Sequence, residues 1–314
     1  MRAFGRLVLV CGLVLGVQGA ALADKTKVSL GTATKGGGFE VFGGGAAQVI
    51  NETDPTLDVM PVGTKGSREN IPLLEAGKLD TALVASLPAY EAFNDVGRAP
   101  TDLKIITAIY STFGMFAVRG DSPAASFRDL VGKPVAWGTK SSGLTLLGKY
   151  VSEALGLDRD KDFQAHFLAK AGDGAPMLLD GRIDGFWGGG VGWPGFVKAM
   201  KGGGRFVGLS AADVALVNAK HPFLKPFTLP AGSYEGQKEA VTSVASYSFL
   251  LARADLPDDV AYRLAKALHQ GHGVLAGRLK QARETTPENT VIAAPTPGHI
   301  HPGVRRYLSE VGIQ

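Results

Sequence analysis

The chain has 314 residues, of which 45% are hydrophobic and 20% are charged. This balance is typical of a folded globular protein and excludes an intrinsically disordered chain. The 43 glycines come in clusters without a fixed period, which excludes collagen and indicates tight turns or close backbone approaches. The formal net charge is +4, with no block of like charges, so nucleic acid is not an expected partner.

The first 23 residues have the pattern of a secretory signal peptide. Two arginines precede the apolar run Leu7–Val17, and a small-x-small cleavage site, Ala21-Leu22-Ala23, follows. Cleavage after Ala23 would place the mature chain outside the cytoplasm, with no apolar run long enough to span a membrane. The only cysteine, Cys11, would be removed, which excludes disulfides, thiolate catalysis and Cys-zinc sites from the mature chain.

The first part of the mature chain alternates short apolar runs with amphipathic ones. The apolar runs predict strands, and the amphipathic runs after Gly38 and over Asn70–Ala76 predict helices. Gly77 follows the second of these as a C-terminal cap. The predicted strands cover Lys27–Leu30, Leu57–Val62, Thr81–Val84 and Ile105–Tyr110.

The same pattern then starts again. Strands are predicted over 135–138, 163–168, 183–187 and 241–251, and helices over 144–155, 257–276 and 304–311. The run Pro72–Asp80 also matches Pro176–Asp184, as helix, glycine cap, basic residue, apolar residue and aspartate before a strand. The alternation predicts an α/β protein, and the repeat favours two similar lobes, although any helix–glycine–strand corner has this appearance.

Sequence patterns of the common catalytic and cofactor sites are missing. There is no Gly-x-Ser-x-Gly elbow and no Walker-type phosphate loop. His269 and His272 share a helix face, and His299 and His301 flank an isoleucine, but neither pair has the glutamate of a zinc motif. We therefore expect no enzyme, no catalytic residue, no metal and no cofactor.

Three loops carry a common theme of glycine, hydroxyl residues and lysine. They are Thr34-Lys35-Gly36, Gly63–Ser67 and Gly138–Ser142, and each follows a predicted strand and opens a helix. In an open α/β sheet such loops meet at one edge, where helix N-termini and free N–H groups suit a carboxylate or another small anion. The same residues are also ordinary turn and cap formers, but three such loops favour a binding role.

The chain resembles the TAXI-type solute receptors of tripartite ATP-independent periplasmic (TRAP) transporters over nearly all of its mature length. The segments that carry the resemblance are Leu30-Gly31-Thr32, Gly63–Asn70, Leu130–Val135, Leu229–Gln237, Arg253–Pro257 and His301-Pro302-Gly303. The resemblance implies a type II periplasmic-binding-protein fold, in which two α/β lobes joined by a hinge close on a small ligand. It also implies delivery of that ligand to the membrane subunits of a TRAP transporter.

On this basis residues 24–118 and 241–314 are expected to form a discontinuous first lobe and residues 119–240 the second. Phe39 and the run Phe186–Trp193 depart from the family pattern near the expected cleft, so a relative's ligand need not transfer. Trp187 is expected either to line the cleft or to pack the core. The predicted ligand-binding residues are Thr32, Thr34, Lys35, Gly37, Phe39, Thr64, Lys65, Ser67, Ser86, Thr139, Lys140, Ser142, Gly143 and Trp187.

The lysines at positions 35, 65 and 140 favour a ligand with two carboxylates, since a lysine can meet a carboxylate as a point charge in a partly closed cleft. An amino acid such as glutamate is the alternative ligand. Two other functions remain open from the sequence. One is a periplasmic sensor or adaptor that presents its bound solute to a membrane signalling protein, and the other is a secreted hydrolase.

Overall fold

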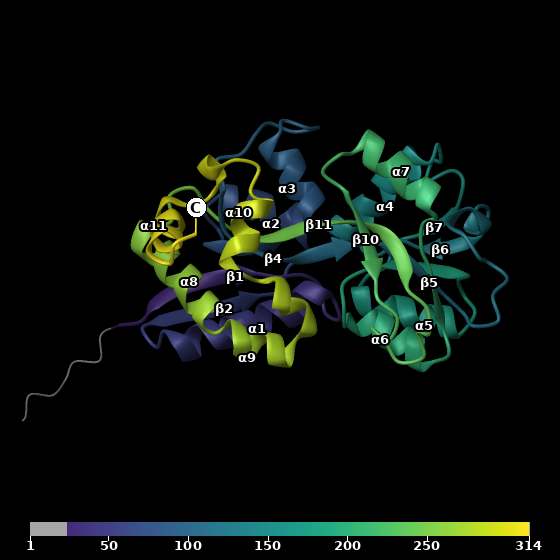
Figure 1. Ribbon diagram of the computed structural model, residues 1–314, viewed down its shortest axis with the longest axis horizontal. Helices are drawn as coiled ribbons and strands as arrows, with labels where there is room; N and C mark the ends of the chain where they lie inside the picture. Colours follow the sequence, from purple (N-terminus) through teal and green to yellow (C-terminus); the bar gives the residue numbers. More distant parts are fainter. Residues whose placement is uncertain (1–23, 314) are drawn as a thin grey trace, which may run out of the picture.

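The computed structural model describes residues 24–313, so the predicted signal peptide lies outside the described residues. Two α/β lobes lie side by side (Figure 1). The strands are β1 (Thr26–Gly31), β2 (Leu57–Val62), β3 (Thr81–Val84), β4 (Lys104–Phe113), β5 (Met115–Val118), β6 (Pro134–Ala136), β7 (Gln164–His166), β8 (Gly185–Gly188), β9 (Arg205–Val207), β10 (Lys225–Leu229) and β11 (Val241–Ala252). The predicted α/β class is confirmed.

Helices cover both sheets, and none among the described residues is long and apolar enough to cross a membrane. The helices are α1 (Gly38–Thr53), α2 (Ser67–Glu75), α3 (Ser86–Phe93), α4 (Gly143–Ala154), α5 (Gly174–Leu179), α6 (Pro194–Lys201), α7 (Ala211–Lys220), α8 (Asp258–Gln270), α9 (His272–Arg278), α10 (Pro287–Ala293) and α11 (Pro302–Glu310). Short 3₁₀ helices lie at Phe127–Leu130, Ala171–Asp173, Lys280–Glu284 and Pro297–His299.

The first sheet runs in the order β10-β11-β3-β1-β2, with β4 paired to β11. Strand β1 is parallel to β2 and β3, whereas the long strand β11 runs antiparallel to β3, β4 and β10. The parallel strands direct their carboxyl ends, and the loops that follow, toward the second lobe (Figure 1). The ligand-binding loops predicted from the sequence are therefore on the edge that faces the other lobe.

The second sheet has the order β7-β6-β8-β5-β9. Strand β6 is parallel to β7 and β8, and β5 is antiparallel to β8 and β9. Each lobe thus combines parallel strands, whose ends lie at the interface, with antiparallel strands that connect the lobes. The two lobes are therefore built in a similar way, as the repeat in the sequence favours.

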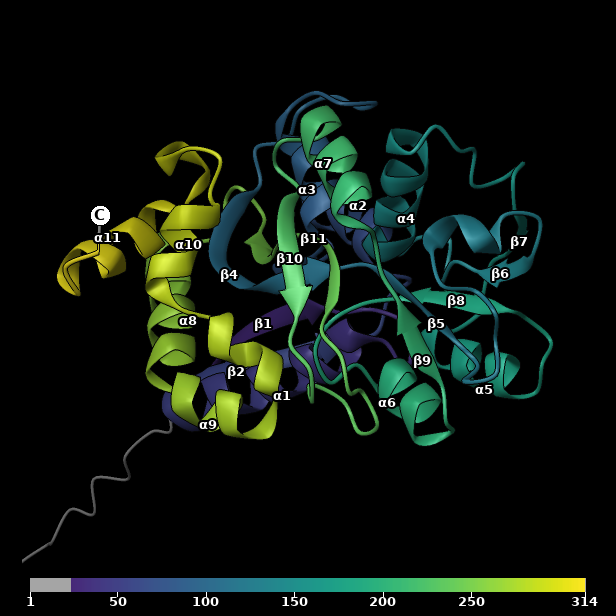
Figure 2. The same cartoon turned by 45° about the vertical axis from the view of Figure 1, so that its right-hand side comes forward.

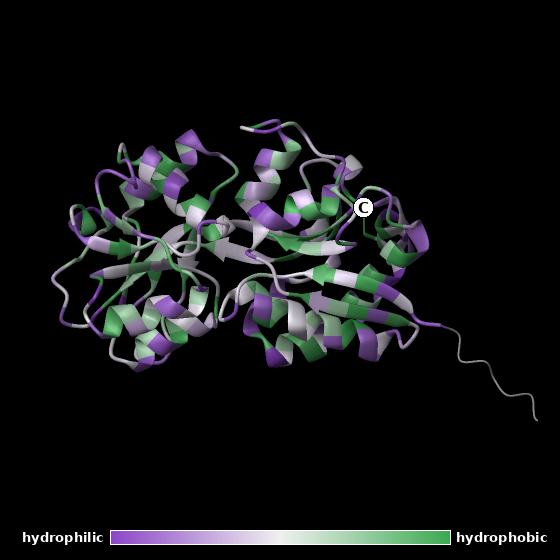
Figure 3. Ribbon diagram, turned by 180° about the vertical axis from the view of Figure 1, so that it is seen from behind, coloured by the Kyte–Doolittle hydropathy of each residue, from purple (hydrophilic) through white to green (hydrophobic). Residues whose placement is uncertain are grey.

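Apolar side chains lie on both faces of each sheet. In the first lobe one core contains side chains from α1, α8 and α11, and a second lies under α2 and α3. Two further cores fill the second lobe, one of them built around the buried Trp137 and Trp187. Figure 3 shows the result, with hydrophobic strands inside and hydrophilic residues on the outer helix faces.

The repeated helix–glycine–strand corner has the same backbone geometry in both lobes. Gly77 and Gly181 have φ angles of 64° and 73°, a region that favours glycine. The residue after each glycine donates its N–H to a carbonyl in the last helical turn, from Lys78 to Leu73 and from Arg182 to Met177. The glycines end the helices and turn the chain into β3 and β8.

The predicted helix over 257–276 is wrong as a single element. The structure has α8 and α9, divided at Gly271. A side chain at this position would place its Cβ 2.2 Å from the Val49 side chain of α1 and 3.0 Å from Thr53. The close approach of the two helices requires glycine here, and the hydrophobic period alone does not reveal it.

The chain passes from the first lobe to the second where one strand follows directly on another. It leaves β4 of the first sheet and enters β5 of the second at Gly114, where any Cβ would lie 2.0 Å from the Trp187 ring. Strand β10 already pairs with β11 in the first sheet, and both lie in the middle of the molecule in Figure 2. The lobe boundaries expected at residues 118 and 241 stay a prediction.

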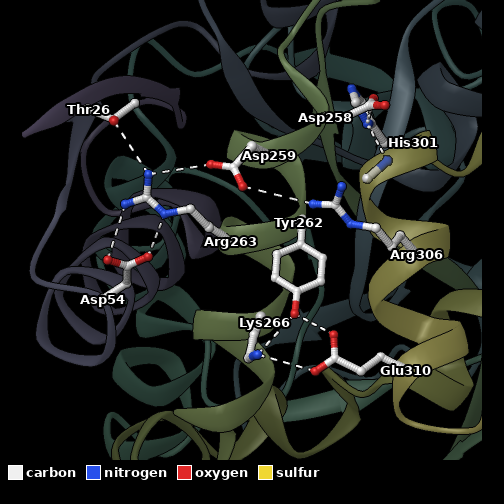
Figure 4. Close-up of polar contacts among 11 residues, drawn as sticks. Thr26, Asp54, Asp258, Asp259, Tyr262, Arg263, Lys266, His301, Arg306 and Glu310 are labelled. Carbon is white, nitrogen blue, oxygen red and sulfur yellow. Dashed lines mark hydrogen bonds and ion pairs between the residues drawn. The ribbon is translucent and has the colours of Figure 1, made fainter.

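An ion-pair network links α8 to α11, and it also links α8 to Thr26 of β1 and to Asp54 after α1 (Figure 4). The Arg263 guanidinium donates to both carboxylate oxygens of Asp54, at 2.8 and 3.2 Å. This hydrogen bonding lowers the pKa of Asp54 to about 2, from an ordinary value of 3.8. Both side chains are about one-fifth exposed, so solvent screens the pair only partly.

Replacing Arg263 with methionine is expected to lower the free energy of unfolding by about 1–2 kcal/mol at neutral pH. Because the folded pKa of Asp54 is depressed, its contribution is present above pH 3.8 and is lost as the pH falls toward 2. Urea unfolding of both proteins between pH 7 and 2.5 tests this.

The control is Arg306→Met, since Arg306 is 57% exposed and lies 3.9 Å from Asp259. This variant is expected to change the unfolding free energy by less than about 0.5 kcal/mol. Equal losses in the two variants would contradict the assignment of the Asp54 shift to Arg263.

Candidate functional site

A cavity of about 90 Å³ lies between the two lobes and is lined by loops from both. Its wall includes residues that follow β1, β2 and β3 in the first lobe and β6 and β8 in the second. The carboxyl ends of five strands therefore meet at one place, which is where open α/β sheets bind ligands.

The lobes are in contact around this cavity. The Trp193 indole N–H of the second lobe donates to the Gly36 carbonyl of the first, at 3.1 Å. The backbone N–H of Ala171 donates to the Thr34 hydroxyl at 3.3 Å. These hydrogen bonds cross the cleft, so the structure is a closed arrangement of the lobes.

Five helices begin at the cavity wall. They are α1, α2, α3, α4 and α6, and their N-caps are Gly37, Gly66, Ala85, Ser142 and Trp193. The N-terminus of a helix carries a partial positive charge and N–H groups without intrahelical partners. Five such ends around one small cavity favour an anion there, and the glutamates in the first turns of α1 and α2, Glu40 and Glu69, offset part of this effect.

Several of these N–H groups are uncommitted. Among residues 24–313, the structure gives no hydrogen-bond partner to the backbone N–H of Gly38, Ser67 or Gly143. Each is the first residue of its helix, on α1, α2 and α4. Two come from the first lobe and one from the second, so an anion between them would be held by both lobes.

Nine of the fourteen residues predicted from the sequence line this cavity. They are Thr34, Gly37, Phe39, Lys65, Ser67, Thr139, Ser142, Gly143 and Trp187. Trp187 does both things that the sequence left open, because its side chain lines the cavity and packs in the second-lobe core, 1% exposed. The structure thus brings together loops that are up to 150 residues apart in the sequence.

The other five predicted residues lie outside the cavity wall: Thr32, Lys35, Thr64, Ser86 and Lys140. The Thr32 hydroxyl donates to the Val62 carbonyl at 3.0 Å, and the Thr64 hydroxyl donates to the Thr32 carbonyl at 3.1 Å. These two threonines hold the β1 and β2 loops against each other. Ser86 is buried as the first residue of α3, and its neighbour Ala85 lines the cavity instead.

The three loop lysines do not converge on the cavity. Lys35 and Lys140 are exposed, and the Lys140 ammonium lies over the Phe167 ring, 5.5 Å from its centroid. Lys65 is at the rim, with a side chain that is 76% exposed and 3.9 Å from Glu69. The positive potential inside the cavity therefore comes chiefly from helix N-termini and not from these side chains.

Four residues of the cavity wall that carry polar side-chain atoms are not among the predicted ligand-binding residues. Tyr110 and Thr112 belong to β4, which reads as a buried strand, and Trp193 precedes α6 in a glycine-rich run. Trp137 follows β6, and its buried indole N–H has no hydrogen-bond partner among the described residues. The available signal was the change from apolar to polar residues within the run Ile105–Phe113, because such a change often marks a strand end at a cleft. The Thr112 hydroxyl is already bonded to Ser248 at 2.6 Å.

Tyr110 is the most informative of these. Its ring packs edge-on against Phe42 and Phe39, with centroids 5.2 and 6.2 Å away. Burial, with a smaller contribution from the negative charge of Glu284, raises the pKa of Tyr110 well above its ordinary value. The phenol stays protonated as a donor, and the structure gives its hydroxyl no hydrogen-bond partner among the described residues.

Tyr110→Phe is expected to weaken binding of an anionic ligand roughly tenfold, or about 1.4 kcal/mol, because one hydrogen bond to a charged group is lost. Tyr262→Phe is the control, since Tyr262 lies in the network of Figure 4, away from the cavity. Titration calorimetry measures both. Unchanged affinity in Tyr110→Phe would show that this hydroxyl does not touch the ligand.

The histidines singled out in the sequence form hydrogen bonds within the first lobe. His269 contacts the Thr107 hydroxyl at 2.9 Å, and His301 accepts the N–H of Gly303 at the start of α11. Among residues 24–313, no group of three or more His, Cys, Asp or Glu side chains is placed to hold a metal ion.

Comparison with known proteins gives the family. A model of the NMT1-like family matches residues 30–312, which is nearly all of the described chain. The protein belongs to the NMT1-like family.

Solved structures give the fold of this NMT1-like chain. The periplasmic aliphatic sulphonate binding protein SsuA from Escherichia coli has 18% identity over 91% of this chain and 84% of its own, with a TM-score of 0.51. An ancestral arginine-binding protein bound to arginine has 14% identity over 81% and 98%, with a TM-score of 0.52. A structure described as a periplasmic transporter has 14% identity over 93% and 94%, with a TM-score of 0.57. The expected two-lobed periplasmic-binding-protein fold is confirmed.

Proposed function

We propose that this NMT1-like chain is a periplasmic solute-binding protein of the TAXI type, which captures a small organic anion and delivers it to a TRAP-type transporter. The observation that carries the proposal is the set of five helix N-termini around one closed cavity between the lobes. Dipoles and free N–H groups stabilise an anion there, and lobe closure excludes water and strengthens each contact.

The periplasmic location and the transport role are supported by three observations of different kinds. The sequence begins with the pattern of a cleavable signal peptide. The family is NMT1-like, and SsuA, which shares the fold, is a periplasmic binding protein for a sulphonate, which is itself an organic anion. The resemblance to TAXI receptors supplies the TRAP transporter as the membrane partner.

A binding assay tests the first part of this proposal. Mature protein is screened against carboxylates, sulfonates and amino acids by thermal shift, and the best compounds are measured by calorimetry. We expect saturable binding of at least one organic anion with a stoichiometry of one, and recovery of that compound unchanged after long incubation. Binding of cations or neutral sugars only, or conversion of the compound over many turnovers, would overturn it.

Transport is tested with proteoliposomes that contain the membrane subunits of a TRAP transporter from the same genome. Uptake of the labelled ligand is expected to need this protein and an ion gradient across the membrane. The control is uptake with ATP inside the vesicles and no ion gradient. Uptake driven by ATP alone would assign the receptor to a different class of transporter.

A further inference from the structure

The wall of the cavity has no carboxylate that would pair with an ammonium. Within the described part of the chain, none of the residues that line it is an aspartate or a glutamate. Three acids close to the wall are already engaged: Glu40 accepts the N–H of Gly36 at 3.2 Å, Glu69 accepts the N–H of Lys65 at 2.5 Å, and Glu284 accepts the N–H of Ser111 at 3.0 Å. An amino group in the closed cavity would therefore be buried without a counter-ion and would face several positive helix ends.

A second acid group on the ligand also lacks a dedicated partner. Lys35 and Lys140 lie outside the wall, and the Lys65 side chain extends into solvent beside Glu69. No arginine is among the lining residues of the described chain. Of the lysine pattern that favours a dicarboxylate in the sequence, only Lys65 reaches the cavity, and it does so at the rim.

The size of the cavity limits the rest of the ligand. Its volume is about 90 Å³, which leaves room for only a few carbon atoms beyond the head group. Phe39, Leu168 and Trp193 line it, and these side chains suit a short carbon chain. The wall thus has a polar part, the helix N-termini, and an apolar part, these side chains. A ligand with one anionic head and one short apolar tail would fit both parts.

We propose that the ligand is a short-chain monoacid that carries one oxyanion head, no amino group and no second acid. This inference rests on the proposed function and narrows its ligand class. The head would accept hydrogen bonds from the free N–H groups of α1, α2 and α4 and from the Tyr110 hydroxyl. A carboxylate and a sulfonate share this chemistry, and the experiment separates them.

The test is a calorimetric comparison of ligands with matched carbon skeletons, on the wild-type mature protein. Butyrate, 2-aminobutyrate and succinate all have four carbons. Compared with butyrate, 2-aminobutyrate carries an added ammonium, and succinate has a carboxylate in place of the terminal methyl group. Propane-1-sulfonate replaces the carboxylate head with a sulfonate. We expect butyrate or propane-1-sulfonate, whichever head the site prefers, to bind at least 100-fold more tightly than 2-aminobutyrate and succinate.

Two variants test the role of the lysines. In Lys35→Met and Lys140→Met the affinity for the preferred monoacid is expected to stay within about twofold of wild type. A tenfold loss in either variant would show that the lysine meets the ligand, and it would overturn the inference.

The remaining outcomes separate this inference from the proposed function. If succinate, glutamate or 2-aminobutyrate binds as tightly as the monoacid, the proposed function as an anion receptor stands, but the inference that the ligand is a monoacid is overturned. Failure of every anion in the wider screen to bind overturns both. Tight binding of the monoacid together with rejection of the two four-carbon analogues supports both.

Discussion

Gly143→Ala is expected to weaken ligand binding about 100-fold while leaving the fold intact. A Cβ at Gly143 would lie 2.3 Å from the Cβ of Ala85 and 3.1 Å from the Pro88 ring. Gly143 begins α4 in the second lobe, whereas Ala85 and Pro88 belong to the start of α3 in the first. The clash lies where the two lobes meet, so we expect the variant to relieve it by opening the lobes and to keep its fold.

The size of the effect follows from the closed population. If the methyl group leaves about 1% of the molecules able to close, the apparent Kd rises about 100-fold, which is roughly 2.7 kcal/mol. Calorimetry with the tightest ligand of the screen measures the affinity, and urea unfolding without ligand measures the fold.

Gly44→Ala is the matched control, because no atom lies within 4 Å of a Cβ placed there on α1. This variant is expected to bind with wild-type affinity. Wild-type affinity in Gly143→Ala as well would show that the ligand is bound without the lobe closure seen here.

The second large effect concerns the pH dependence of stability. Burial lowers the pKa of His269 to about 4, from an ordinary value of 6.5, and the neighbouring His272 adds to the lowering. Between these values the unfolded chain binds a proton at this histidine that the folded chain does not. Stability is therefore complete above pH 6.5 and is lost as the pH falls toward 4.

A difference of about 2.5 pH units corresponds to about 3 kcal/mol of unfolding free energy. His269→Gln removes the titration and keeps a polar group next to the Thr107 hydroxyl, which lies 2.9 Å from the histidine ring nitrogen. We expect the wild type to lose about 3 kcal/mol more than this variant between pH 7 and pH 4, as measured by urea unfolding. His166→Gln, at an exposed position, serves as the control and should follow the wild type. Parallel pH curves for wild type and His269→Gln would contradict the prediction.

Much of the fold could be predicted because its signals are local. Leu57–Val62 and Thr81–Val84 are apolar runs bounded by turn residues, and both are strands with these bounds. Gly77 and Gly181 mark the helix ends because only glycine takes a positive φ without strain. Such features depend on a few neighbouring residues and remain the same whatever packs against them.

The candidate site was predictable in part. Its loops follow strand ends, and nine of the predicted residues line one cavity. The lysines at 35 and 140 misled the analysis because the loop position of a residue does not give the direction of its side chain. Tyr110 was missed because it lies in a strand that reads as core, and only the pairing of β4 with β11 brings it beneath α1.

The sequence by itself determined the α/β class, the two similar lobes, the order of most strands and helices, and the glycine-rich loops at strand ends. These follow from hydrophobic period and backbone preference, which act over a few residues. Only the tertiary structure decided which helix ends meet at the cavity, that α8 and α9 separate at Gly271, and that Gly143 lies against Ala85 and Pro88 of α3. These are contacts between segments far apart in the chain, set by how the two lobes pack, and no local pattern of residues carries that distance information.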